Sequence, residues 1–306
     1  MPKRVVTVYS AAHFFIDFAC AFLMFRSITA APDWALCILL YNFCAFALQM
    51  PLGILADKWS RNYITAAAGC IFVCAAYGLT AAPIIAAAAA GVGNAMFHIG
   101  GGIDVLNVSK GKSGALGVFV SPGALGVYFG TVLGKGDSPL AVPILLALLA
   151  AAGLIAALCR AVPRNAPFSL GGGNISRKIL LAIALGLFLI VCLRSYVGLT
   201  LDFPWKSAGY WGTALLCATV LGKTAGGFIA DRFGAVRVGF LALGLAAALF
   251  LFPSVPAAGV GAMLLLNVTM PVTLWGMVKL FPNAKGFAFG LLTFALFIGF
   301  LPVYFS

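Results

Sequence analysis

Long apolar runs separated by short polar gaps organise this chain. Eleven runs have about the 20 residues that a helix needs to cross about 30 Å of hydrocarbon, and charges, prolines or glycine clusters mark their ends. Backbone exposed to lipid must be hydrogen-bonded within a helix or a closed barrel, and no run shows the alternation of a barrel strand. The pattern therefore predicts an all-α membrane protein. The eleven predicted spans are residues 5–26, 34–56, 62–81, 83–106, 113–134, 139–161, 178–201, 208–230, 236–253, 256–280 and 285–305.

Composition supports a membrane protein and excludes most catalytic chemistry. Of 306 residues, 63% are hydrophobic and 8% are charged, whereas soluble proteins have about 25% charged residues. The chain has two histidines and seven acidic residues, with no phosphate-binding loop, zinc motif or Ser-His-Asp order. We therefore expect a protein that is not an enzyme and needs no cofactor or metal. Any pumping must draw on an ion gradient or on substrate exchange.

Basic residues outnumber acidic ones by 19 to 7. Such a balance can mark a nucleic-acid partner, but here the basic residues lie mainly in the gaps between apolar runs. With the N-terminus in the cytoplasm, 14 of them fall inside and only Arg26, Lys135 and Lys206 fall outside, which is the bias typical of membrane proteins. We expect a bacterial-type cytoplasmic (inner) membrane protein whose partner is lipid rather than nucleic acid, with Ser306 outside.

One motif recurs along the chain at a fixed distance. Gly53 and Asp57, after the second run, match Gly227 and Asp231, after the eighth, 174 residues later. A repeat of this length indicates a duplicated unit of six spans, the second copy having five. The predicted domains are an N-terminal bundle in 1–161, a cytoplasmic linker in 162–177 and a C-terminal bundle in 178–306.

The recurring segments resemble the G-x-x-x-D-[KR] loop of the major facilitator superfamily of transporters. Residues 12–17 and 93–98 are also similar to segments of the fosmidomycin-resistance type of drug efflux protein. The resemblance covers nearly the whole chain. It implies two repeats that alternate access to a midplane site lined by spans one, four, seven and ten, and a latch between the repeats that closes the inner side. The residues of this gating motif are Gly53, Asp57, Lys58, Arg61, Gly227, Asp231 and Arg232.

The superfamily usually has twelve spans, so the resemblance implies that a peripheral last span is missing. A second copy of the chain or a small separate subunit could cover the flank that this leaves open. A truncated chain is the alternative explanation.

Two polar pairs lie inside predicted spans, where an ionisable group is costly unless it faces a cavity or a partner. His13 and Asp17 stand four residues apart on one helix face, as do Asn94 and His98. The rise of about 1.5 Å per residue places the two histidines at one depth and Asp17 with Asn94 at another. Histidine beside a carboxylate suits a proton relay, so we assign proton coupling to His13, Asp17 and His98. The alternative is that these groups only hold the helices together.

Polar residues of the second repeat suggest a substrate site. We assign substrate binding to Arg194, Asn267 and Thr273, together with Asn94, because guanidinium pairs well with carboxylate or phosphate. Arg194 could instead be the partner of an aspartate, Asp17 or Asp202. The sequence favours an interfacial position for Lys223, whose side chain can extend toward the inner surface.

These assignments predict a secondary active transporter that works by alternating access, probing a small-molecule substrate and protons as its partners. We expect proton-coupled export of a small amphipathic or anionic compound. An importer of a small organic anion is the alternative within transport. A membrane sensor or structural subunit that transports nothing is the alternative outside it.

Overall fold

The computed structural model describes residues 2–136, 138–171 and 175–306, in which every regular element is helical. Part of the predicted linker, residues 172–174, lies outside the described residues. The helices are α1 (Pro2–Leu23), α2 (Trp34–Asn42), α3 (Gln49–Trp59), α4 (Asn62–Tyr77), α5 (Pro83–Val108), α6 (Gly114–Val120), α7 (Pro122–Lys135), α8 (Ala141–Leu158), α9 (Arg177–Thr200), α10 (Trp211–Phe233), α11 (Ala235–Phe250), α12 (Pro256–Leu280) and α13 (Lys285–Phe305), with π-helical segments η1 (Met24–Ile28) and η2 (Phe43–Ala47).

The prediction of eleven helical segments is confirmed, with differences in detail. Nine segments of the described chain are long and apolar enough to cross a membrane, whereas α4 and α11, the third helix of each repeat, have 16 residues each. The predicted span 113–134 divides into α6 and α7 because Pro122 has no N–H and begins a new helix. Two other predicted spans contain the π-helical segments η1 and η2.

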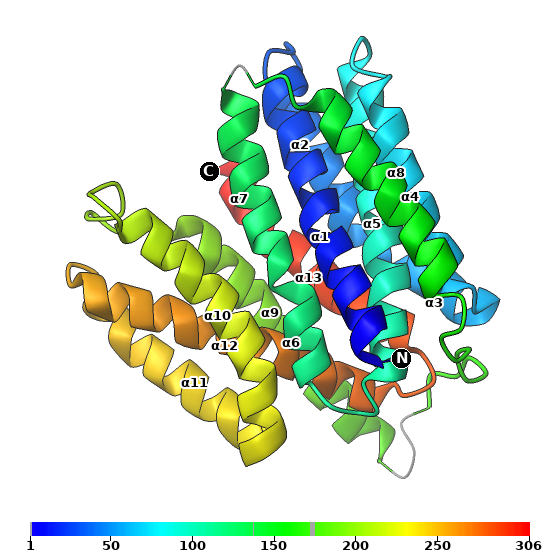
Figure 1. Ribbon diagram of the computed structural model, residues 1–306. Helices are drawn as coiled ribbons and strands as arrows, with labels where there is room; N and C mark the ends of the chain where they lie inside the picture. The colour runs from blue at the N-terminus through cyan, green and yellow to red at the C-terminus, as the bar shows by residue number, and fades with distance from the viewer. Residues whose placement is uncertain (1, 137, 172–174) are drawn as a thin grey trace.

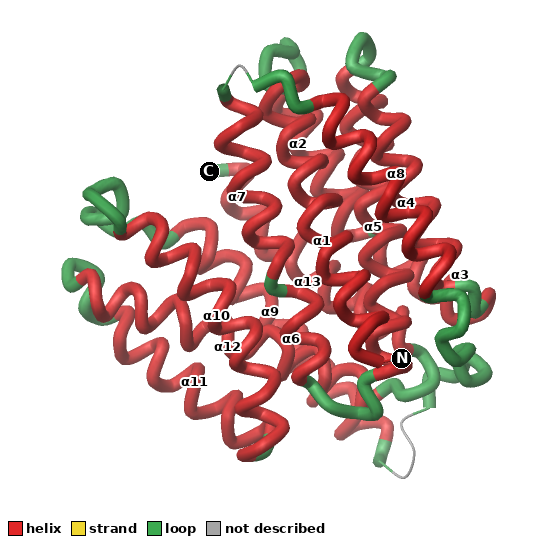
Figure 2. Tube along the Cα trace, viewed as in Figure 1, coloured by secondary structure: helices red, strands yellow, loops and turns green. Residues whose placement is uncertain are grey.

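The helices form two groups that meet at an angle (Figure 1). The N-terminal group comprises α1–α8, with α1 packed on α7 and α4 on α5, and the C-terminal group comprises α9–α13, with α10 and α11 packed on α12. Figure 2 shows loops only at the helix ends and at the bend between α6 and α7. Close packing of α1 on α7 requires glycine, since a Cβ at Gly126 or Gly130 would overlap carbonyl oxygens of α1.

The two groups touch along two unequal flanks. On one flank, α13 of the C-terminal group follows α2, η2 and α3 over their length. Phe297 packs on Phe43 with ring centroids 5.7 Å apart, and the Tyr304 hydroxyl donates a 3.1 Å hydrogen bond to the Ala35 carbonyl. On the other flank, α10 packs mainly on the short helix α6, and the Thr224 hydroxyl donates to Ser121 Oγ at 2.8 Å.

The flank of the C-terminal group carries an apolar groove of about 420 Å³ between α9, α11 and α12. In the N-terminal group, α8 packs against α1 and α4, which correspond in repeat order to α9 and α11. The groove therefore lies where the repeat would place a further helix. A covering subunit or second copy remains a prediction.

Candidate functional site

The two predicted pairs of polar residues meet between α1 and α5. The Nε2 atoms of His13 and His98 lie 2.8 Å apart. Asp17 Oδ2 lies 3.1 Å from His13 Nε2, and Asp17 Oδ1 lies 3.7 Å from His98 Nε2. The amide of Asn94 donates a 2.9 Å hydrogen bond to the same carboxylate. The structure thus brings together all four side chains, at the depths that the helical spacing predicts.

The break between α6 and α7 positions His13. Pro122 has no N–H to offer the Val118 carbonyl, which instead accepts hydrogen bonds from the hydroxyls of Ser10 and Ser121. One residue further on, the Phe119 carbonyl accepts a 2.7 Å hydrogen bond from His13 Nδ1. The last turn of α6 therefore fixes the His13 ring by its far nitrogen.

Hydrogen bonding fixes the tautomers of both histidines. A carbonyl oxygen only accepts, so His13 Nδ1 donates to Phe119 and His98 Nδ1 donates to the Asn94 carbonyl at 2.8 Å. Both Nε2 atoms would then carry lone pairs in the neutral rings, and two lone pairs cannot make a contact of 2.8 Å. One extra proton must lie between them. The His13–His98 pair therefore carries a single positive charge, which the Asp17 carboxylate balances.

The same three side chains offer the ligand types of a metal site, with one ligand atom from each and all within 4.8 Å of one another. Two imidazole nitrogens that bind one tetrahedral ion at about 2.0–2.1 Å stand roughly 3.3 Å apart. The Nε2 atoms of His13 and His98 are 2.8 Å apart. This separation fits a shared proton, and a metal ion would require the rings to move apart.

Two cations of the C-terminal group complete the polar region. Arg194 on α9 is half-buried, and its Nη1 donates to Thr273 Oγ1 on α12 at 3.5 Å. Lys223 on α10 is also half-buried, within electrostatic range of Arg194, Asp17 and His98. Neither cation forms an ion pair with a carboxylate of the described residues, so the suggested partners Asp17 and Asp202 do not hold Arg194.

The remaining predicted substrate residues differ in their surroundings. Thr273 contacts Arg194, and Asn94 contacts Asp17. Asn267 instead donates its side-chain amide to the Met263 carbonyl of its own helix at 2.8 Å and packs beside Gly222. The structure therefore keeps it apart from the polar groups around Asp17.

Lys223 was expected at the interface, and the structure places it in the interior facing the proton site. Asp104 was missed altogether. It is buried near the end of α5, where its carboxylate accepts hydrogen bonds from the Tyr9 hydroxyl at 2.7 Å and from Asn62 Nδ2 at 2.9 Å. An acidic residue inside an apolar run is the signal that could have identified it.

The two repeated aspartates each cross to the other helix group. Asp57, near the end of α3, accepts hydrogen bonds from the backbone N–H groups of Gly286 and Phe287 at 2.9 and 3.0 Å, at the first turn of α13. Carboxylates are favoured at helix N-termini, where N–H groups are unpaired and the helix dipole is positive. Backbones approach closely here, because a Cβ on Gly53 would overlap the Gly286 carbonyl.

Asp231, near the end of α10, forms the matching contact on the other flank. Its carboxylate accepts from the backbone N–H groups of Ser113 and Gly114 at 2.7 and 2.9 Å, and from the Ser113 hydroxyl at 2.8 Å. Gly227 allows this approach, since a Cβ there would meet the Ser113 carbonyl. The two aspartates thus form symmetric contacts between the groups, as a latch requires.

The basic residues of the repeated motif lie outside these contacts. The Lys58 ammonium lies 5.3 Å from the ring of Phe168 in the linker, and the Arg232 guanidinium lies 5.3 Å from Phe233. Arg61 is exposed and lines a pocket under the linker.

Replacing Asp231 with Ala should loosen the α6–α10 contact. Three hydrogen bonds to one carboxylate are lost, and a hydrogen bond to a charged group contributes about 1.5–3 kcal/mol. We expect amide exchange at Ser113 and Gly114 to become at least roughly tenfold faster by mass spectrometry, because about 1.4 kcal/mol corresponds to a factor of ten. The matched control is Asp202→Ala, which removes an exposed aspartate. Unchanged exchange at Ser113 and Gly114 would show that Asp231 does not hold the contact.

Comparison with known proteins supports the fold. No protein-family model and no curated protein matches the chain. Among solved structures, it is similar to the Escherichia coli fucose:proton symporter FucP, with a TM-score of 0.66 and 16% identity, covering 97% of this chain and 90% of that one. A structure of the major facilitator superfamily transporter FucP in the outward conformation gives 0.67 and 15%, covering 96% and 88%.

A third similar structure is that of a bacterial homologue of the iron transporter ferroportin in an outward-facing state. Its TM-score is 0.55 and its identity 16%, covering 99% of this chain and 90% of that one. The chain therefore has the fold of a major facilitator superfamily transporter. Together with the nine apolar helices in its described part, this fold supports an integral membrane protein.

Proposed function

We propose that this protein is a proton-coupled secondary transporter of small anionic or amphipathic compounds. The observation that carries the proposal is the His13–His98 pair, whose 2.8 Å contact requires a shared proton beside Asp17. An imidazole has an ordinary pKa near 6.5 and can therefore gain or lose a proton near neutral pH. The likeness to a fucose:proton symporter supports proton coupling.

The substrate class follows from the two cations of the C-terminal group. Arg194 and Lys223 are half-buried within apolar helices and lack a carboxylate partner among the described residues. A charge in such a position is costly unless something balances it. An anionic group of the substrate would supply that balance, with Thr273 beside Arg194 as a further contact.

Alternating access would use the two aspartate latches. Both latches are closed in the structure, at the end of the bundle that carries the basic loops. With that end in the cytoplasm, as the distribution of Lys and Arg predicts, the protein is closed to the cytoplasm in this conformation. Release of Asp57 and Asp231 would accompany the change to the opposite conformation.

Export by exchange with protons is the direction that we propose, and import of an organic anion together with protons is the second candidate. The protein would be reconstituted in liposomes loaded with small carboxylates or organophosphates and a pH-sensitive dye, then diluted into medium without the anion. Exchange would acidify the lumen as the anion leaves. Cotransport would make the lumen more alkaline. Protein-free liposomes report passive leakage, and a lumen pH that matches them for every anion would leave a membrane sensor or structural subunit as the function.

Replacing Arg194 with Gln should weaken binding of the transported anion. A hydrogen bond to a charged group contributes about 1.5–3 kcal/mol, so we expect KM to rise roughly 10- to 100-fold. Arg194→Lys keeps the charge but loses the planar geometry, and its KM should lie between the two. Lys206→Gln, which removes an exposed cation of a loop, serves as the control. Equal KM values for all four proteins would remove Arg194 from the site.

A further inference from the structure

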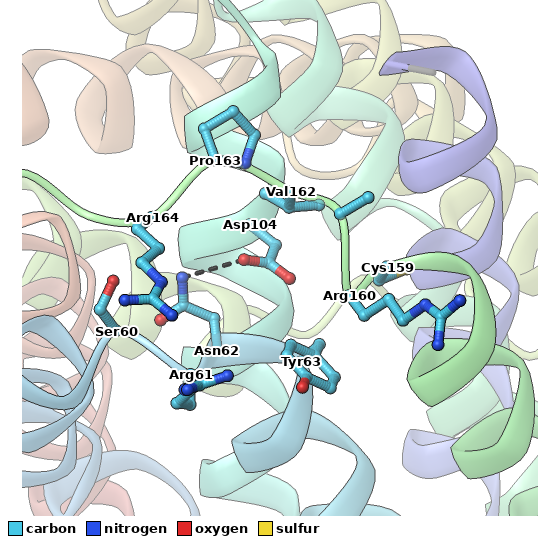
Figure 3. A pocket seen from close by; sticks show the side chains of 11 residues that line it. Ser60, Arg61, Asn62, Tyr63, Asp104, Cys159, Arg160, Val162, Pro163 and Arg164 are labelled. Atoms are coloured by element: carbon cyan, nitrogen blue, oxygen red, sulfur yellow. Dashed lines mark hydrogen bonds between the residues drawn. The ribbon is translucent and has the colours of Figure 1, made fainter.

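A second polar pocket lies away from the proton site, where the linker leaves α8 (Figure 3). Its volume is about 170 Å³, which corresponds to about five or six water molecules at roughly 30 Å³ each. Residues 159–164 form one wall, and the first residues of α4 and Asp104 form the other. The pocket opens at the same end of the bundle as the latches.

Three guanidinium groups line this pocket. Arg61 and Arg164 lie near Asn62, and Arg160 lies across the pocket from them (Figure 3). None of the three forms an ion pair with a described carboxylate. Asp104 is the one acidic residue of the lining, and both its oxygens already accept hydrogen bonds, from Tyr9 and Asn62. The pocket therefore presents a net positive charge.

The start of α4 adds to this charge. The helix begins at Asn62, and no side chain caps its N-terminus. Unpaired N–H groups and the positive end of the helix dipole attract anions at such a position. Planar guanidinium groups next to it suit a phosphate, to which arginine donates two hydrogen bonds at once.

Hydrogen bonds hold the linker wall in place. The backbone N–H of Asn165 donates to Ser60 Oγ at 2.8 Å, and its side-chain amide donates to the Ala56 carbonyl at 3.2 Å. Asn62 and Asn107 both donate to Asn165 Oδ1 at 2.9 Å. The arginines on either side of Asn165 thus project from a fixed wall, so the pocket exists before any ligand binds.

The surface next to the pocket is apolar and faces outward. Helices α4 and α8 pack together and both end at the pocket. Their exposed apolar side chains include Ile64, Ile71, Phe72, Leu146, Leu149 and Leu154. Acyl chains could lie along this surface while a phosphate occupies the pocket at the membrane interface. A free phosphate ion would make no use of it.

We propose that this pocket binds the phosphate headgroup of an anionic phospholipid, held by Arg61, Arg160 and Arg164, with the acyl chains along α4 and α8. Basic pockets between helices on the cytoplasmic side are suited to such headgroups. A bound lipid would join the linker to the start of α4, three residues beyond the end of α3.

Native mass spectrometry of the detergent-purified full chain tests this site. Phosphatidylglycerol and phosphatidylcholine are titrated separately, and we expect bound phosphatidylglycerol in clear excess over phosphatidylcholine. In the double variant Arg160→Gln/Arg164→Gln, phosphatidylglycerol affinity should fall at least tenfold. The matched control Arg177→Gln/Lys178→Gln removes two exposed cations outside the pocket and should bind as the unmodified protein does.

Further arms separate the alternatives. Arg160→Lys/Arg164→Lys retains the charge and should bind more phosphatidylglycerol than the Gln variant, which also shows that loss of binding is not loss of folding. Equal loss in the Gln variant and its control would overturn the site, since charge alone would explain it. Binding of inorganic phosphate without a preference for phosphatidylglycerol would overturn the lipid assignment.

Discussion

Asp17→Asn should abolish transport driven by a pH gradient while the protein stays folded. The carboxylate balances the proton shared by His13 and His98, and an amide carries no charge to do so. Removal of one partner of a buried ion pair costs about 3–5 kcal/mol, so the affinity of the histidine pair for its proton should fall more than roughly a hundredfold. The measurement is the change of lumen pH in liposomes loaded with the anion.

Asp202→Asn is the matched control, because it makes the same change at an exposed position. Exchange of labelled for unlabelled anion without a pH gradient should continue in Asp17→Asn, which shows that the binding site persists. Normal proton coupling in this variant would mean that Asp17 and the histidines serve only to join α1 and α5.

Gly53→Val should prevent closure of the latch between α3 and α13. The added side chain would overlap the backbone of Gly286, which cannot move aside as a flexible side chain could. Overpacking of this kind costs about 1–3 kcal/mol or more. The hydrogen bonds from Gly286 and Phe287 to Asp57 should open, and their amide exchange should become at least roughly tenfold faster. Transport should stop, because one of the two conformations is no longer reached.

Gly244→Val provides the comparison for this prediction. Nothing lies within 4 Å of a Cβ at that position of α11, so the same substitution there should leave exchange and transport unchanged. If Gly53→Val retained slow exchange at Gly286 and Phe287, the close contact would not be needed for the latch.

The number of helical segments could be predicted from the sequence because length and hydrophobicity decide whether a segment spans a bilayer. The interruptions within spans could not. Pro122 gives a local signal for the break between α6 and α7, but apolar runs say nothing about η1 and η2, where only the hydrogen-bond register of the backbone changes.

The proton site was also accessible from the sequence, because helical spacing fixes the depths of His13 and Asp17 relative to Asn94 and His98. Their contacts depend on α1 lying beside α5, which the resemblance to a transporter family supplied. The direction in which Lys223 points could not be predicted, since a long side chain in a span can turn either way. The partners of the latch aspartates depend on long-range packing for the same reason.

The full-length contact of α13 with α2, η2 and α3 has a consequence for how the protein would move. Helix α13 is joined to its neighbours at Asp57, at Phe43 and at Ala35, whereas α10 meets the other group mainly at α6. Two bodies bound along the whole of one edge and along half of the other do not separate evenly. The easier motion is a swing about α13, like a book turning on its spine, with the passage widening between α7 and α10.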